Sequence, residues 1–358
     1  MNRNFGLDIV RAIAIWLVLL QHGGVNIPGL TPLKIGGIGV EFFFVLSGFL
    51  IGGILFREID KQNSIPKTLA SFWVRRWFRI LPLYYAVLLF KFIVIDSAIG
   101  WNILYYVFFL QNNFYGIDYF GVSWSLVIEE WFYLFAPIFI MLSNKILKTE
   151  KKVFFSLITF LIFVNLIRIL YVYQKNVPYE GVNGNFPFRF DSLFLGVILA
   201  FLKHKKWSFF EKLQSPVVFF TGMGLFLCYI YYYRTLSFPD NLINQSFFPR
   251  TVGFFILPFT ISLTIPYIST IEEKADSTGI RKIIFELITI TSVLTYAIYL
   301  LHPFVFAITL DNAFILKSKI IGLPIAILFT YIAAWITYQI FEKPILKYRD
   351  KITSSNKK

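Results

Sequence analysis

The stretch that decides the fold is residues 7–22, LDIVRAIAIWLVLLQH, because it is almost wholly apolar and long enough for most of a membrane span. The whole chain of 358 residues is 57% hydrophobic and 20% aromatic, well above the norm for soluble proteins. The sequence therefore predicts an all-α integral membrane protein with about ten transmembrane helices. They are expected to begin near residues 7, 38, 79, 125, 153, 187, 215, 249, 285 and 320.

Positive charge is unevenly divided among the predicted loops. Most of the 34 Lys and Arg residues fall in segments on the same side as the N-terminus. Because cytoplasmic loops carry such an excess, both termini are predicted to be cytoplasmic. The net charge of +14 then reflects topology and contact with anionic membrane lipids. Its division among short loops argues against nucleic acid as a partner.

The apolar segments continue almost to residue 341 without a long polar insert. One membrane domain is therefore predicted over residues 1–345, followed by a short basic cytoplasmic tail at 346–358. Residues 101–110 are too few to span the bilayer and are expected to form an interfacial or re-entrant segment. A single cysteine, Cys228, and three histidines far apart in sequence suggest no metal site.

Two ionisable residues of the first helix, Arg11 and His22, share one face. They are eleven residues apart, which at about 100° per residue leaves about 20° between their directions and a rise of about 16 Å. A cationic group near the cytoplasm and a titratable base farther out could hold a phosphorylated donor and present its thioester across the bilayer. Alternatively, Arg11 snorkels to the interface and His22 is a hydrogen-bonded packing residue.

Two glutamates are further candidates. Glu41 opens the second helix, and a loop containing Pro28 and Gly29 joins that helix to His22, so both side chains should lie near the outer edge. A carboxylate there could orient the imidazole and stabilise its protonated form, or bind a helix N-terminus. Glu129, near the outer start of the fourth helix, could bind an acceptor hydroxyl or a helix end.

A basic block is predicted at the cytoplasmic end of the third helix. It contains Arg75, Arg76 and Arg79, of which the first and last are four residues apart on one face. Planar, multi-donor guanidinium groups suit a polyphosphate. An inner loop is also expected to be basic for topological reasons, so the pattern alone leaves both interpretations open.

Taken in order, the motifs of this chain resemble the acyltransferase-3 family. Arg11 and His22 in their opening segment resemble the family's arginine, ten residues, histidine signature. Each motif alone is weak, but the ordered set is specific and covers nearly the whole chain. The other matching segments are residues 41–50, 72–85, 124–134, 189–196, 296–303 and 341–344.

The resemblance implies a multi-pass O-acyltransferase of the cytoplasmic (inner) membrane, with acetyl-CoA as the usual donor and an envelope or secreted carbohydrate as the acceptor. It implies that His22 is catalytic and that Arg11 and the 75–79 arginines contact the coenzyme. His22, oriented by Glu41, would act as a general base on the acceptor hydroxyl or briefly take the acyl group.

Some members of that family carry a fused extracytoplasmic hydrolase-like domain, whereas this sequence stops at Lys358, just after the last predicted helix. The expectation is therefore that the membrane domain acylates its acceptor directly or that a partner protein outside the cytoplasm does so.

Other roles and classes stay open. Arg189 and Asp191 could pair with each other or contact the acceptor. His302, next to Pro303, is expected to be structural, and Ser47 is expected to serve close helix packing. A transporter or flippase for lipid-linked glycans would also need many helices and buried charge. A non-catalytic membrane partner would not depend on the first-helix histidine.

Overall fold

The computed structural model describes residues 3–24, 35–61, 64–114, 116, 118–237, 242–273, 278–310 and 319–355. Within these ranges all regular structure is helical, and eight helical segments are long and apolar enough to cross a membrane. They are α1 (Phe5–His22), α2 (Ile35–Asp60), α3 (Ile65–Phe90) with η1 (Lys91–Ile95), η3 (Gly121–Ser123) with α6 (Trp124–Leu147), α7 (Glu150–Lys175), α11 (Pro216–Ser237), α14 (Gly279–Leu310), and α15 (Lys319–Thr337) running through η6 (Tyr338–Glu342) into α16 (Lys343–Ser355).

Two predicted spans, near residues 187 and 249, correspond to the shorter helices α9 (Phe190–His204) and α13 (Gly253–Ile268). Every residue of α9 from 190 to 202 is buried, and a helix enclosed on all sides belongs to the core of a bundle. The all-helical membrane fold is thus confirmed for the described residues, and ten crossings remain a prediction.

Short elements connect the long helices: η2 (Gly100–Asn102), α4 (Ile103–Val107), α5 (Gln111–Phe114), α8 (Tyr179–Asn183), η4 (Phe186–Arg189), α10 (Ser208–Leu213), η5 (Leu242–Asn244) and α12 (Phe247–Arg250).

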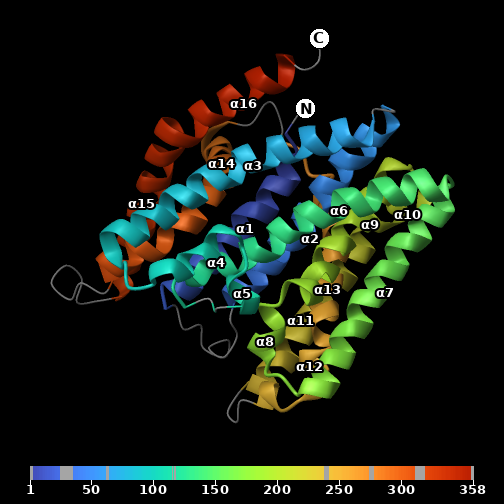
Figure 1. Ribbon diagram of the computed structural model, residues 1–358, viewed down its shortest axis with the longest axis horizontal. Coiled ribbons are helices and arrows are strands. Elements are labelled where there is room, and N and C mark those ends of the chain that lie inside the picture. Colours follow the sequence, from blue (N-terminus) through green and yellow to red (C-terminus); the bar gives the residue numbers. More distant parts are fainter. Residues whose placement is uncertain are drawn as a thin grey trace.

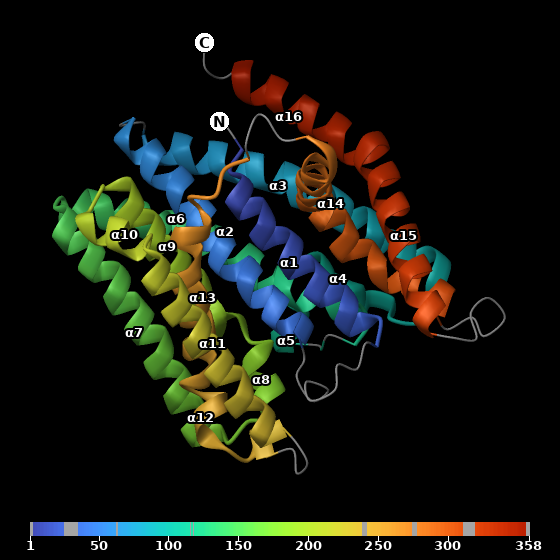
Figure 2. The same cartoon turned by 180° about the vertical axis from the view of Figure 1, so that it is seen from behind.

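The centre of the bundle is formed by α1, α2 and α9, with α2 packed extensively against both of the others. Helices α3, α14, α15 and α16 flank this centre on one side, and α7, α10, α11 and α13 flank it on the other (Figures 1 and 2). The start of α1 and the end of α16 lie at the same end of the molecule in both views. This arrangement agrees with both termini on one side of a membrane; which side remains a prediction.

The third helix begins at Ile65 rather than near residue 79. A proline in its first turn, Pro66, is compatible with a helix start because its missing N–H needs no partner there. The sequence placed the basic block at the cytoplasmic end of the third helix, before the apolar span expected from residue 79. In the structure these arginines lie within α3 and line an internal cavity, so the helix continues through them.

The loop with Pro28 and Gly29 lies outside the described residues, as do residues 356–358 of the predicted tail. The described part of that tail, residues 346–355, belongs to α16. Residues 101–110 contain the end of η2 and the five-residue helix α4. These elements are short, which agrees with the prediction that this segment does not span the bilayer.

Glycines allow α2 and α9 to approach each other closely. A Cβ atom added to Gly48 would lie 1.8 Å from the carbonyl oxygen of Leu193, and one added to Gly196 would lie 2.0 Å from that of Val45. No real Cβ atom tolerates such a distance to backbone, so the helices would have to separate. The small-residue packing expected around Ser47 is therefore observed at its neighbour Gly48.

We expect Gly48→Ala to lower the free energy of unfolding by about 1–3 kcal/mol, the usual cost of overpacking, or more if α9 is displaced. Thermal unfolding of the detergent-purified protein would measure this. The matched control is Gly224→Ala in α11, where an added Cβ meets nothing within 4 Å. Equal melting temperatures for the two variants would contradict the prediction.

Candidate functional site

A large cavity of about 1060 Å³ lies between α1, α2, α3, α6, α14 and the η6–α16 segment. We call it the basic cavity, because its lining holds eight Lys or Arg residues against four Asp or Glu residues. All four arginines predicted from the sequence are among them, so the structure brings residues from α1 and α3 to one place. The eight are Arg3, Arg11, Arg57, Lys61, Arg75, Arg76, Arg79 and Arg349.

Several polar atoms around the basic cavity lack a hydrogen-bond partner. The Nε atoms of Arg75 and Arg76 and the Oε1 atom of Glu342 are buried without one. Buried polar groups are normally satisfied, so unpaired guanidinium N–H groups beside a net-positive cavity indicate a place for an anion.

Arg11 is held in place by Asp8, one turn earlier on α1. The Arg11 Nη1 atom donates to Asp8 Oδ1 at 2.9 Å, and Asp8 also pairs with Arg3 and accepts from Ser292 Oγ at 2.7 Å. Because Asp8 is only 1% exposed, it is a buried counter-ion for two cavity arginines. Its spacing of three residues from Arg11 was the sequence signal that could have identified it.

Glu129 contacts the basic cavity rather than an outer helix end. Its Oε1 atom accepts from Ser47 Oγ at 3.0 Å, and its Oε2 atom accepts from Tyr133 OH at 2.8 Å. Arg76 donates to the same tyrosine hydroxyl and lies over the Tyr133 ring, 4.2 Å from its centroid. The carboxylate therefore belongs to a chain of contacts that runs from Arg76 to Ser47 along the cavity wall.

A smaller pocket of about 270 Å³ contains His22 and Glu41, together with Trp124 and the four tyrosines 179, 229, 233 and 299. We call it the histidine pocket. Val40 and Tyr299 line both this pocket and the basic cavity, so the two spaces adjoin. Burial first, and then neighbouring Tyr233, raises the pKa of Tyr179 of the short helix α8 well above its usual value.

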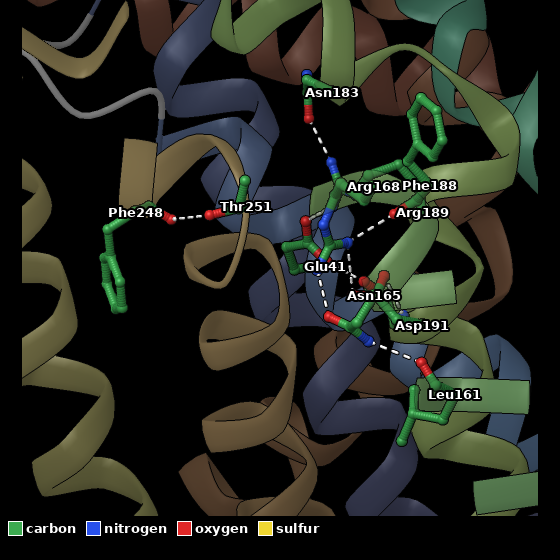
Figure 3. A network of polar contacts seen from close by, with 11 residues as sticks. Glu41, Leu161, Asn165, Arg168, Asn183, Phe188, Arg189, Asp191, Phe248 and Thr251 are labelled. Carbon is green, nitrogen blue, oxygen red and sulfur yellow. Dashed lines mark hydrogen bonds and ion pairs between the residues drawn. The ribbon is translucent and has the colours of Figure 1, made fainter. Parts of the chain in front are cut away.

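Glu41 does not serve as the direct partner of His22 that the sequence suggested. Its carboxylate forms an ion pair with Arg189 (Figure 3). It also accepts a hydrogen bond from Ser192 Oγ at 2.8 Å. The direct contact was not predictable, because a glutamate and a histidine at the same edge of the membrane can have side chains that point to different neighbours. Glu41 instead compensates a guanidinium that is 0% exposed.

Arg189 and Asp191 likewise have separate partners. Arg189 binds Glu41 and Asn183, whereas Asp191 pairs with Arg168 at 2.7 Å (Figure 3). Both members of the second pair are 0% exposed. Of the two alternatives left open by the sequence, the direct pair between Arg189 and Asp191 is not formed, and each residue instead has an ion-pair partner on another element. Both side chains are therefore engaged in buried ion pairs.

The structure brings together two histidines that are far apart in sequence. The rings of His22 and His302 are 4.7 Å apart between centroids and nearly perpendicular, at 82°. Sequence spacing gave no signal for this contact, and His302 was expected only to have a structural role. Among the described residues no cluster of three or more potential metal ligands is formed.

The chain also resembles known proteins over most of its length. Residues 4–339 match the family model described as an acyltransferase domain, acyltransferase-3. The chain belongs to the acyltransferase-3 family.

Three relatives of this acyltransferase-3 chain have O-acetyltransferase names. "Putative O-acetyltransferase SACOL0978" of Staphylococcus aureus (strain COL) is 28% identical over 96% of this chain and 57% of its own length. "Peptidoglycan O-acetyltransferase OatA" of Listeria monocytogenes is 28% identical over 95% and 55%. "Putative peptidoglycan O-acetyltransferase YrhL" of Bacillus subtilis is 26% identical over 95% and 54%. The chain thus spans little more than half the length of these relatives. No solved structure matches it.

Proposed function

We propose that this protein is an O-acetyltransferase of the cytoplasmic membrane, with ten crossings and both termini in the cytoplasm. It takes the acetyl group of cytoplasmic acetyl-CoA and transfers it to a hydroxyl of an envelope carbohydrate. The observation that carries the proposal is that the basic cavity adjoins the histidine pocket at Val40 and Tyr299. One space suits a polyanionic donor, and the other holds the base.

The donor fits the basic cavity chemically. Coenzyme A carries several phosphate charges at one end and an uncharged pantetheine arm at the other. The arginines of α1 and α3 supply N–H donors for the phosphates, including the unpaired Nε atoms of Arg75 and Arg76. The arm would then extend past Tyr299 toward His22. The cavity volume is that of a site for a large ligand.

The reaction needs one base. His22 would take the proton of the acceptor hydroxyl while its oxygen attacks the thioester carbonyl carbon. The C–S bond then breaks, and the leaving thiolate takes the proton from the imidazolium. In the alternative sequence, His22 attacks the thioester carbonyl carbon first, the C–S bond breaks, and the thiolate leaves with a proton from the acetyl-imidazolium. The acceptor oxygen then displaces the imidazole, which takes the hydroxyl proton.

The acceptor is proposed to enter the histidine pocket. A tryptophan and four tyrosines line it together with the polar side chains of Gln21, Glu180 and Asn183. Aromatic faces cover the apolar faces of sugar rings, while amides and carboxylates bind hydroxyls. The names of two relatives suggest peptidoglycan as the first carbohydrate to examine.

Inverted membrane vesicles provide the test. With labelled acetyl-CoA outside, label should appear in a carbohydrate inside, and mass spectrometry of envelope glycans from cells with and without the gene should identify it. Movement of unmodified glycan without acetylation would instead support the flippase alternative. Transfer by the purified protein alone would separate direct acylation from transfer through an extracytoplasmic partner protein.

We expect the double variant Arg75→Gln/Arg79→Gln to raise the KM for acetyl-CoA by about tenfold or more, because each charged hydrogen bond contributes about 1.5–3 kcal/mol. Initial rates at varied acetyl-CoA would show this. Arg281→Gln, an exposed position of α14 outside the basic cavity, is the control. A double variant with unchanged KM would exclude these arginines from the donor site.

A further inference from the structure

His302 of α14 has one ring nitrogen engaged and the other unpaired. Its Nδ1 atom lies 3.1 Å from the carbonyl oxygen of Ile298. A carbonyl oxygen only accepts hydrogen bonds, so Nδ1 carries the proton and donates. In a neutral ring the Nε2 atom is then a bare acceptor. That atom is buried and has no hydrogen-bond partner in the structure.

The surroundings of His302 favour the neutral ring. Its side chain is 0% exposed, and its ring neighbours are the aromatic side chains of His22, Tyr299 and Phe306. No acidic side chain is paired with it within the described residues. An imidazolium without a counter-ion would be costly to bury there. The unpaired Nε2 atom therefore needs a donor rather than a carboxylate.

His22 is the neighbour that can supply this donor. The two rings meet edge to face at 4.7 Å between centroids, which is close enough for an N–H group of one ring to reach a nitrogen of the other after a small rotation. The carboxylate expected beside His22, that of Glu41, is already bound by Arg189 and Ser192. Among the described ring contacts, His302 is the polar partner of the His22 ring.

We infer that His302 Nε2 accepts a hydrogen bond from an N–H group of His22 and thereby leaves the other His22 nitrogen free as the base in the histidine pocket. His302 is then a positioning residue that acts through His22 without touching the reacting atoms. Its role resembles that of the carboxylate in a catalytic triad, which fixes the tautomer and orientation of a histidine. This role rests on the proposed transferase function, but the hydrogen bond does not.

The hydrogen bond can be measured without activity. The chain has three histidines, so ¹⁵N-histidine-labelled protein in lipid nanodiscs gives few ring signals, which His204→Gln helps to assign. In the wild type, His302 Nε2 should be unprotonated and hydrogen-bonded, and His22 should show a single tautomer. The inference would be overturned if the ¹⁵N chemical shift of His302 Nε2 in the wild type were that of an unprotonated nitrogen without a hydrogen bond.

Two variants then test the positioning role. His302→Leu keeps an apolar filling but has no acceptor, whereas His302→Gln places an amide oxygen near the former Nε2 atom. In the leucine variant, His22 should populate both tautomers and acetyl transfer should fall by about tenfold or more, with the KM for acetyl-CoA unchanged. The glutamine variant should recover part of both properties.

Equal rates and equal His22 spectra in the leucine variant and the wild type would overturn the positioning role. So would equal losses in the leucine and glutamine variants. The control His204→Gln alters a residue that binds Asp60 outside both cavities, and it should leave the transfer rate unchanged. If the wild type itself transfers no acetyl group, the proposed function fails, while the spectra still decide whether the hydrogen bond exists.

Discussion

Replacement of His22 by alanine is expected to reduce acetyl transfer by about 10²–10⁴-fold, the usual contribution of a general base. His22 ends α1 and lines the histidine pocket. Its removal leaves the basic cavity intact, so donor binding should persist while the chemical step fails. Acetylation of envelope glycans in cells and single-turnover transfer in vesicles would both report the loss.

The His22→Ala protein must still insert and fold for this result to count. Its affinity for coenzyme A should match that of the wild type, and its melting temperature should fall only slightly, because the side chain lies at the helix end and its loss leaves only His302 Nε2 without a donor. His204→Ala serves as the matched histidine control, since His204 binds Asp60 at 2.7 Å away from both cavities. Full acetylation by the His22→Ala variant would rule out both the base and the acyl-carrier mechanism.

The architecture was largely predictable from the sequence, because hydropathy and helix length report directly on the bilayer. The shared face of Arg11 and His22 followed from helical geometry alone. The start of α3 was missed for a physical reason. Hydropathy treats an arginine as facing lipid or water, whereas Arg75, Arg76 and Arg79 face an internal cavity.

Partners between helices could not be predicted, since they depend on how each helix is rotated and how deep it lies. Glu41 and His22 were expected near one edge, and both line the histidine pocket. The Glu41 carboxylate nevertheless pairs with Arg189, which is far from it in the sequence. The contact between His22 and His302 joins residues 280 positions apart. Sequence reasoning supplied the candidates, and only the packing of α1 on α14 supplied the pair.

The largest effect on stability is expected from Arg168→Met in α7. Arg168 donates to Asp191 and to the carbonyl oxygen of Phe188, each at 2.7 Å, and to Asn165 (Figure 3). Because Arg168 and Asp191 are both 0% exposed, removal of one charge leaves the other buried and unpaired. Such a change costs about 3–5 kcal/mol, which should lower the melting temperature markedly or prevent accumulation of the protein.

The double variant Arg168→Met/Asp191→Leu separates the cost of an unpaired charge from the contribution of the pair itself. Replacement of both partners by apolar residues is often close to neutral, so it should restore much of the stability lost in Arg168→Met. Lys175→Met, at the exposed end of the same helix, is the control for loss of a positive charge. A double variant as unstable as the sum of its single variants would show that the two side chains act independently. Recovery would instead show that most of the stability lost in Arg168→Met comes from the Asp191 carboxylate, which is left buried without its partner.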